Sequence, residues 1–461
     1  MSFDPRSIAA FRYAGMRYDE DTAVAEFDFE LVPADDAAEP IRFTESVALT
    51  AGFAAPALDD AAEARFTAVL VLLGAVLGLS YYKAAAPPRI ELAVGGLSDA
   101  AVDYLRVLIR EGLAEYAYRN DLPGLIEPEL VRTAPAGAVP PLRHLEGAPL
   151  VPIGGGKDSI ITVESLRAAQ LDPVEFVVNP NAVHERVADA SGFPLVAARR
   201  RLDPSLLALN AAGALNGHVP VTAMNSLIAV AQSVRLGLGP VVMSNESSAS
   251  DPTLHWSLPT GEVAVNHQWS KSLDGELALS AALVGQAGLV DAVFSLLRPF
   301  SELRIARGYA TTAHIVAYDR AMVSCNRAFR ISGATPSWCG DCDKCRFVFL
   351  VLAPWMDADR LIGIVGSDLF DDLGQLPGFR DLLGLGAHKP FECVGEEAEA
   401  SVAVALLTRQ PRWAASPVIS ALVAEAPELA AGDAEAEARL LGEAPAPLLP
   451  EPFEGARRAL V

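Results

Sequence analysis

Lysine is the scarcest charged residue in this 461-residue chain, with five lysines among 36 basic residues. Acidic residues number 58, so the formal charge is −22 at neutral pH. Nucleic-acid binding needs clustered basic side chains that neutralise phosphates, and this charge balance argues against a nucleic-acid partner. An anionic ligand must therefore meet a local positive pocket. The scarcity of lysine draws attention to the five that remain, at positions 83, 157, 271, 344 and 389.

Long hydrophobic runs and secretion signals are also missing. The longest apolar run, Phe66–Leu79, is shorter than the ~18 to 20 residues of a membrane-spanning helix, so it predicts a buried helix. Charged residues such as Asp4 and Arg6 interrupt the N-terminus, which does not resemble a signal peptide. We expect a cytoplasmic protein without a membrane partner. Five cysteines in a long intracellular chain indicate a metal site or catalysis before disulfides.

The most informative segment is Gly154–Gly156, which joins the apolar stretch Pro149–Ile153 to an apolar-periodic helix. Glycines allow close backbone approach to an anion, and a helix N-terminus attracts negative charge, so the segment predicts a phosphate site. A Walker loop would need Ser or Thr after Lys157, and a dinucleotide fingerprint would need glycine at position 159. The segment resembles instead the SGGxDS signature of the PP-loop ATP pyrophosphatases, with Gly154 in place of the first serine. That resemblance implies cleavage of ATP to AMP and pyrophosphate.

Strand and helix patterns alternate after a Pro- and Gly-rich linker at 134–141, which predicts an α/β fold with a doubly wound parallel sheet. We expect three domains: an N-terminal α+β domain at 1–146, a PP-loop ATP-binding catalytic domain at 147–392, and an acidic helical appendage at 393–461. In a doubly wound sheet the ligand lies at the carboxyl ends of the strands. Asn179 and the polar run 244–251 follow predicted strands, so both are expected beside the glycine loop.

Four cysteines have the spacing Cys-x13-Cys-x2-Cys-x2-Cys, which is typical of a structural zinc site. They are Cys325, Cys339, Cys342 and Cys345. Gly340 and Asp341 would let the backbone turn around the metal. An iron–sulfur cluster and a redox Cys-x-x-Cys are alternatives that the spacing leaves open. Cys393 is expected to be a buried bystander.

Other polar segments offer proton carriers. His267 and Lys271 would share a face if their segment were helical. Gly217 and His218 precede the helix predicted at Val221, and the basic triplet 199–201 is a weaker candidate for phosphate contact.

Five motifs together resemble the ATP-dependent UDP-N-acetylmuramoyl-L-alanyl-L-glutamate epimerases, the MurL family. They are GGGKDS at 154–159, NGHVPVTA at 216–223, SNESSAS at 244–250, NHQWSKS at 266–272 and WCGDCDKCRFVF at 338–349. A further segment, SYYKAAAP at 80–87, is included in the resemblance. The resemblance covers most of residues 1–392. It implies inversion of the terminal L-glutamate of a peptidoglycan precursor through an acyl-adenylate, with ATP, Mg²⁺ and a structural Zn²⁺. The Cys cluster also resembles the zinc knuckle of 7-cyano-7-deazaguanine synthases, so a PP-loop amidating or nitrile-forming enzyme and a non-catalytic ATP sensor are the alternatives.

These observations give a set of expected site residues. Nucleotide binding is expected at Gly154, Gly155, Gly156, Lys157, Asp158, Ser159, Asn179, Ser244, Asn245 and Glu246. Catalysis is expected from Lys157, Asp158, Ser159, His255, His267 and Lys271, and the sequence does not identify which of the last three is the α-carbon base.

Overall fold

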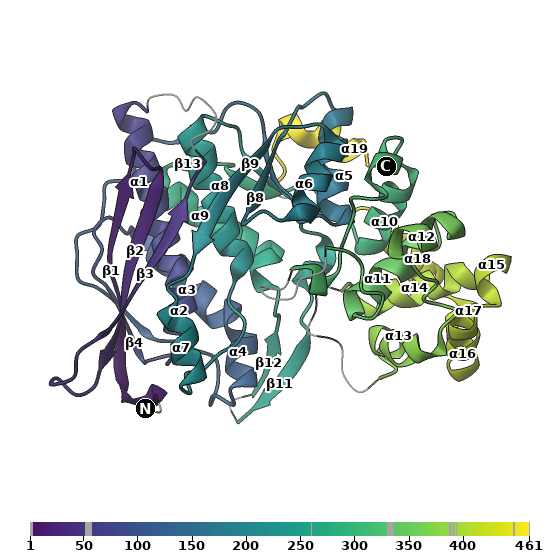
Figure 1. Ribbon diagram of the computed structural model, residues 1–461, viewed down its shortest axis with the longest axis horizontal. Coiled ribbons are helices and arrows are strands. Elements are labelled where there is room, and N and C mark those ends of the chain that lie inside the picture. The colour runs from purple at the N-terminus through teal and green to yellow at the C-terminus, as the bar shows by residue number, and fades with distance from the viewer. Residues whose placement is uncertain are drawn as a thin grey trace.

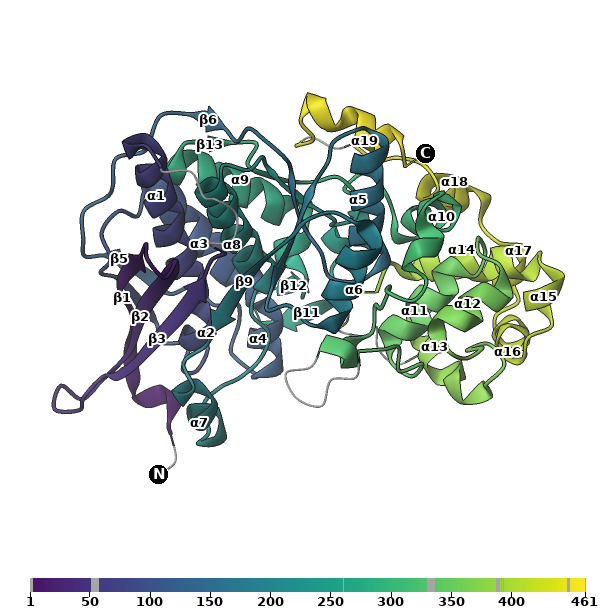
Figure 2. The same ribbon diagram turned by 45° about the horizontal axis from the view of Figure 1, so that its top comes forward.

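The computed structural model describes residues 3–50, 58–259, 261–329, 336–386, 390, 392, 394–445 and 448–460. One large sheet, with helices on its faces, forms the N-terminal and central parts of the molecule (Figures 1 and 2). Helices make up the C-terminal part, which lies at the opposite end from the first strands (Figure 1).

The large sheet has ten strands in the order β14-β10-β7-β8-β9-β3-β2-β1-β4-β5. The strands are β1 (Ile8–Asp19), β2 (Val24–Pro33), β3 (Ile41–Ala48), β4 (Arg89–Leu92), β5 (Glu129–Arg132), β7 (Leu150–Pro152), β8 (Val174–Val178), β9 (Leu195–Arg201), β10 (Val241–Met243) and β14 (Val293–Ser295). Three neighbouring pairs are antiparallel, β9–β3, β3–β2 and β2–β1, and the other pairs are parallel. A mixed α/β fold with a mostly parallel sheet is thereby confirmed.

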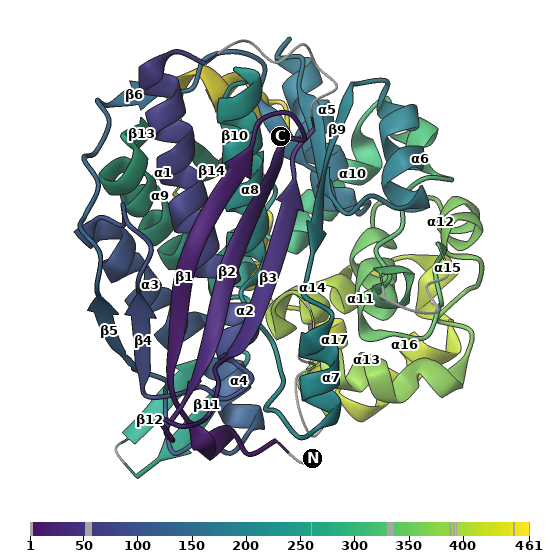
Figure 3. The same cartoon turned by 60° about the vertical axis from the view of Figure 1, so that its left-hand side comes forward.

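The sheet is continuous across the expected boundary at residue 146. Strand β3 of the N-terminal region pairs with β9 of the central region, with Ser46 opposite Arg201 and Ala48 opposite Arg199. Figure 3 shows β5, β4, β1, β2, β3 and β9 side by side. The division into three domains stays a prediction, but the first two share one sheet.

The strand order changes direction at β7. The chain leaves β7 through α5 (Lys157–Ala168) to β8, and it later returns through α8 (Val221–Leu236) to β10 on the other side of β7. Helices α5 and α6 (Ala182–Ser191) lie on one side of β8 and β9, and α8 lies on the other (Figure 2). A reversal of this kind opens a crevice at the carboxyl ends of the two central strands.

Helix α1 (Asp60–Leu77) is the central helix of the N-terminal region. It packs against α8 and against α9 (Leu273–Ala287). By length and composition the stretch Asp60–Tyr82 could cross a membrane, but 72% of its most apolar window is buried inside the protein. This is the pattern of a core helix, as the sequence predicts for Phe66–Leu79.

The remaining helices complete both ends of the fold. They are α2 (Leu79–Tyr82), α3 (Asp99–Gly112), α4 (Ala114–Arg119), α7 (Ser205–Ala211), α10 (Glu302–Thr311), α11 (Asp343–Leu352), α12 (Ala358–Val365), α13 (Leu376–Leu382), α14 (Glu397–Thr408), α15 (Pro411–Ala414), α16 (Pro417–Glu425), α17 (Glu428–Ala431), α18 (Ala434–Leu440) and α19 (Glu454–Arg458). Two small sheets are added, β11 (Leu254–Leu258) with β12 (Gly261–Val265), and β6 (Arg143–His144) with β13 (Leu289–Val290).

The C-terminal helices are part of the core. Val402, Leu407 and Trp413 are buried in one cluster with the apolar face of α11. Glu399 on α14 is also buried, and one of its carboxylate oxygens accepts a hydrogen bond of 3.3 Å from the backbone N–H of Leu303. The last seventy residues therefore support the element that carries Glu302.

Two local predictions were wrong. The segment expected to place His267 and Lys271 on one helix face is a turn followed by a short 3-10 helix, Trp269–Lys271. The cause is the side chain of Asn266, whose Oδ1 accepts the backbone N–H of Gln268 at 2.8 Å and so competes with helix formation. The apolar pattern that begins at Ser98 favours a single helix over 98–118, but the chain there is divided at Leu113 into α3 and α4.

Candidate functional site

The glycine loop lies between β7 and α5, as predicted. Gly155 has φ +83°, and a Cβ built there would lie 2.5 Å from Cγ1 of Val183, so only glycine fits. At Gly154 a Cβ would meet no atom within 4 Å. Among the described residues no side chain caps α5, which leaves its first-turn N–H groups available to an anion.

Ser159 closes the loop from within the helix. The backbone N–H of Gly154 donates to Ser159 Oγ at 3.3 Å, and the hydroxyl donates to the carbonyl oxygen of Gly156 at 3.3 Å. The hydroxyl therefore holds the loop in shape, whether or not it also contacts a ligand.

Lys157 is fully buried and is paired with two carboxylates, Asp158 and Glu302. Burial alone would lower the pKa of Lys157, but the two carboxylates raise it above its ordinary value. Burial likewise would raise the pKa of Glu302, but Lys157 and Lys344 hold it below its usual range. Both side chains are thus charged in the folded protein.

Three of the five lysines meet around two buried glutamates. Lys344 Nζ lies 3.5 Å from Glu302 Oε1. Lys271 also lowers the pKa of Glu302, and it lowers that of the buried Glu246. The net effect on Glu246 is still upward, to about 7, because burial and Glu302 outweigh the lysines. We call Lys157, Asp158, Glu246, Lys271, Glu302 and Lys344 the charged cluster.

Glu302 was missed by sequence reasoning. It is the first residue of α10, which follows β14, and Ser301 caps that helix by accepting from the N–H of Arg304 at 3.0 Å. The signal was a Ser-Glu pair at the head of an amphipathic helix, a common start of an ordinary helix. Nothing local distinguishes such a glutamate from a surface residue.

Arg298, also missed, holds two motif loops together. It is buried, and its guanidinium donates to the backbone carbonyls of Glu246 and Lys271, each at 2.6 Å. The same guanidinium pairs with the buried carboxylate of Glu276 at 2.6 Å. The segments 244–250 and 266–272 are therefore fixed relative to each other.

Other expected nucleotide-binding residues make hydrogen bonds within the protein that hold its loops and strands in place. The side-chain amide of Asn179 makes two hydrogen bonds to the backbone of Arg200. It accepts from the N–H of Arg200 at 2.9 Å and donates to the carbonyl oxygen of Arg200 at 3.1 Å. Ser244 Oγ donates to Thr162 Oγ1 at 2.9 Å. Asn245 is buried, and its carbonyl accepts from Ser295 Oγ at 2.6 Å. All lie after β8 or β10, at the edge where the glycine loop follows β7.

The three candidate bases are separated in space. His255 is on the β11–β12 hairpin, is more than half exposed, and lies 3.3 Å from Glu262. His267 follows the second strand of that hairpin, and its Nδ1 lies 2.7 Å from Thr253 Oγ1. Lys271 belongs to the charged cluster.

A second group surrounds His218, next to the charged cluster. The rings of His218 and His267 are 6.3 Å apart between centres. Lys83 Nζ donates to Asn216 Oδ1 at 2.7 Å and to the carbonyl of Gly217 at 2.9 Å. Burial first, and then the neighbours His267, Lys271, Lys83 and Arg119, together lower the pKa of His218 to about 4.

The four predicted cysteine thiols form one cluster, with all sulfur atoms within 4.8 Å of one another. Cys342 and Cys345 are 3.4 Å apart, and Cys339 and Cys345 are 3.7 Å apart. A tetrahedral zinc with Zn–S bonds of ~2.3 Å requires sulfur atoms about 3.8 Å apart, so the donor set fits this metal. Gly340 makes the turn with φ +66°. The predicted bystander, Cys393, lies outside the described residues.

The thiol cluster is joined to the charged cluster through one residue. Lys344 lies between Cys342 and Cys345 at the start of α11. A metal that fixes both thiolates would also fix the helix turn from which Lys344 reaches Glu302.

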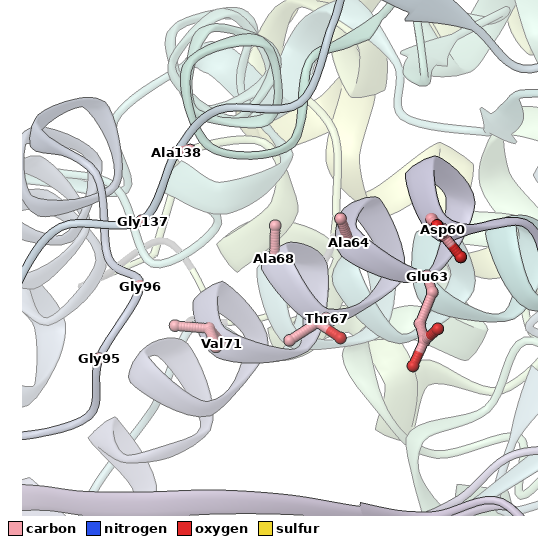
Figure 4. Close-up of a pocket in the computed structure, with 10 residues that line it drawn as sticks. All are labelled: Asp60, Glu63, Ala64, Thr67, Ala68, Val71, Gly95, Gly96, Gly137 and Ala138. Atoms are coloured by element: carbon pink, nitrogen blue, oxygen red, sulfur yellow. The ribbon is translucent and has the colours of Figure 1, made fainter.

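One well-formed pocket lies elsewhere. It has a volume of about 430 Å³ between α1 and the segments Gly95–Gly96 and Gly137–Ala138, with Ala64, Ala68 and Val71 along its helical side (Figure 4). None of the expected site residues lines it, and its walls offer mainly apolar surface.

The charge pairs of Lys157 carry a testable expectation. Lys157→Met leaves Glu302 buried with one lysine in place of two, which should destabilise the fold by about 3–5 kcal/mol. The urea midpoint of unfolding measures this change. In the double variant Lys157→Met/Glu302→Gln the charge is also removed, so most of the lost stability should return. A double variant no more stable than the single one would contradict the pairing.

The geometry described so far defines a class of protein: a mixed α/β protein with a glycine loop and a buried charged cluster at the carboxyl edge of its sheet, and with four thiols placed to hold a metal ion. Comparison of sequences gives the family. Residues 2–296 match the MurL N-terminal domain, and residues 321–437 match the MurL C-terminal domain. The chain belongs to the MurL family.

Curated relatives cover nearly the whole chain. Proteins of Micromonospora sp. and Salinispora tropica are each 51% identical over 428 residues, 92% of this chain and 92% and 90% of theirs. A protein of Xanthomonas oryzae pv. oryzae is 37% identical over 439 residues, 95% of this chain and 94% of its own. Each is named UDP-N-acetyl-alpha-D-muramoyl-L-alanyl-L-glutamate epimerase. No solved structure matches the chain significantly.

Proposed function

We propose that this protein epimerises the terminal L-glutamate of UDP-MurNAc-L-Ala-L-Glu to D-glutamate, using ATP and releasing AMP and pyrophosphate. The substrate rests on the name shared by relatives that match almost the entire chain. The proposal that ATP is used rests on one structural observation. The charged cluster lies at the start of α5, a helix that follows the glycine loop and has no side-chain cap.

The proposed fold of the central region is that of the PP-loop ATP pyrophosphatases. Its support is the strand order β10-β7-β8-β9, all parallel, with the glycine loop directly after β7 where the order reverses. In such a site the phosphates lie against the loop N–H groups and the N-terminus of α5.

Activation of the carboxylate explains why an epimerase would use ATP. Removing the α-proton next to a free carboxylate places a second negative charge beside the first. Attack of the carboxylate oxygen on the α-phosphorus expels pyrophosphate and gives a mixed anhydride, whose α-proton a modest base can remove. Reprotonation on the other face inverts the centre, and water then releases AMP and the free D-glutamate.

The charged cluster assigns roles to individual residues. Lys157 is enclosed by Asp158 and Glu302, so we assign it to the support of the loop. Lys271 is only half-buried and is the better placed counter-charge for departing pyrophosphate. Asp158 and Glu246 supply the carboxylate oxygens that Mg²⁺ takes as ligands, and Mg²⁺ offsets phosphate charge when bound.

We propose zinc as the metal of the thiol cluster, in a structural role, because four thiolates complete its shell and leave no position for water. We also propose a cytoplasmic location, where ATP and nucleotide-linked cell-wall precursors are made. The family relationship favours epimerisation over amidation or nitrile formation on a heterocycle, and ammonia-dependent turnover would favour those alternatives instead.

Solvent isotope incorporation tests the function directly. In D₂O with ATP and UDP-MurNAc-L-Ala-L-Glu, we expect AMP, pyrophosphate and D-glutamate that carries deuterium at its α-carbon. Hydrolysis of the product, chiral chromatography and mass spectrometry measure both features. ADP with phosphate would refute the PP-loop chemistry, D-glutamate without deuterium would refute proton abstraction, and AMP without inversion would indicate simple activation of the carboxylate.

A further inference from the structure

Two imidazoles that come from distant parts of the chain, those of His218 and His267, lie close together. His218 precedes α8, and His267 follows β12. Their rings are 6.3 Å apart between centres and inclined at 72°. Nothing in the sequence pairs these residues, because 48 positions separate them and neither segment is regular at that point.

The spacing matches what inversion at a planar carbon demands. An acid or base must approach the reacting atom to about 2.6–3.2 Å, so two groups on opposite faces of one carbon are about 5–6 Å apart. The ring centres of His218 and His267 are 6.3 Å apart, which is close to this separation. A carbon between the rings can lose a proton on one face and gain one on the other.

Neighbouring residues hold both rings, and His218 has the positive groups Lys83 and Lys271 near it as well as the carboxylate of Glu115, 4.0 Å from its Nδ1. The Nδ1 of His267 lies 2.7 Å from Thr253 Oγ1. The loop of His218 is held by Lys83, and by the amide of Asn120, which donates to the carbonyl of Asn216 at 3.0 Å. Lys271 acts electrostatically on His218 as well as on Glu302, so the imidazoles are next to the place proposed for adenylation.

We propose that His218 and His267 are the acid–base pair of epimerisation, with His218 taking the α-proton of the L-epimer and His267 giving a proton to the opposite face. The C–H bond breaks toward a nitrogen of His218, its electron pair moves into the activated acyl group, and the N–H of His267 supplies the proton of the new C–H bond. This inference rests on the proposed function. Burial, together with the positive neighbours, lowers the pKa of His218, so its imidazole is neutral and able to accept a proton.

Replacing one histidine at a time should give a pattern of α-proton exchange and inversion that a merely structural role of these residues would not produce. In D₂O with ATP, His267→Asn should exchange the α-proton of the L-epimer without inverting it, because His218 remains. His218→Asn should exchange the α-proton of the D-epimer only, again without inverting it, because His267 remains. Inversion should fall roughly 10³-fold in both, while pyrophosphate release continues. His144→Asn, on an exposed strand far along the chain, is the matched control and should behave as wild type.

The outcomes separate this inference from the proposed function. Inversion within tenfold of wild type in either Asn variant would overturn the pair, as would exchange of both epimers by each variant. Loss of pyrophosphate release in proportion to inversion would also overturn it, since binding or folding would then explain the effect. A wild-type protein that forms no AMP or D-glutamate would refute the proposed function itself.

Discussion

Gly155→Val should reduce pyrophosphate release by at least about 10²-fold, because it displaces the loop that positions the phosphates. A β-branched residue is strained at φ +83°, and its Cβ would lie 2.5 Å from Val183 on α6, an element that cannot move alone. The expected loss is in turnover with ATP, measured by a coupled pyrophosphate assay. Circular dichroism and the unfolding midpoint would show whether the rest of the fold is kept.

Gly154→Ser is the matched control for this change. A Cβ at Gly154 meets no atom within 4 Å, and the substitution restores the serine with which the PP-loop signature usually begins. We expect it to keep or increase turnover. Wild-type rates from Gly155→Val, or equal losses in both variants, would contradict the role given to the loop.

Cys342→Ala should release the metal and lower the thermal stability of the whole C-terminal part. Structural zinc contributes about 10–16 kcal/mol of apparent binding energy in small domains at neutral pH, and that energy is coupled to folding. Elemental analysis should find about one zinc per chain in the wild type and much less in the variant. The variant should also release pyrophosphate more slowly, because Lys344 lies between two of the thiols and reaches Glu302.

Cys393→Ala is the control, since the sequence predicts that cysteine to be a bystander. Its zinc content and unfolding midpoint should equal those of the wild type. If the purified protein were brown and contained iron and labile sulfide, the four thiols would hold an iron–sulfur cluster and not zinc. Full metal content in Cys342→Ala would remove that thiol from the site.

Local patterns in the sequence predicted what depends on local chemistry. Apolar and acidic residues alternate within 22–31, which favours a strand, and this stretch forms β2, in which buried and half-buried positions alternate. The apolar stretch, glycines and helix around position 155 appear as β7, loop and α5. The short spacings between Cys339, Cys342 and Cys345 bring three thiols together independently of the rest of the fold. The fourth thiol, that of Cys325, lies with them as predicted.

Contacts between distant segments could not be read in the same way. Glu302 meets Lys157 only because β14 pairs with β10 and places α10 beside α5. The short apolar stretch at 194–197 favours a strand of that length, but β9 extends to Arg201, because pairing with β3 adds partners that the sequence of β9 does not reveal. The proximity of His218 and His267 depends equally on tertiary packing, and no propensity encodes it.

The pairing of β3 with β9 has a practical consequence for dividing this enzyme. A chain that begins near residue 147 would leave β9 as an edge strand, with backbone donors and acceptors at Arg199–Arg201 exposed to other molecules. Exposed edges of this kind recruit further strands and lead to aggregation. Such a fragment would also lack Lys83, whose ammonium holds the loop of His218. Truncated versions that keep the glycine loop and the thiol cluster should therefore be insoluble and, where recovered, unable to invert glutamate.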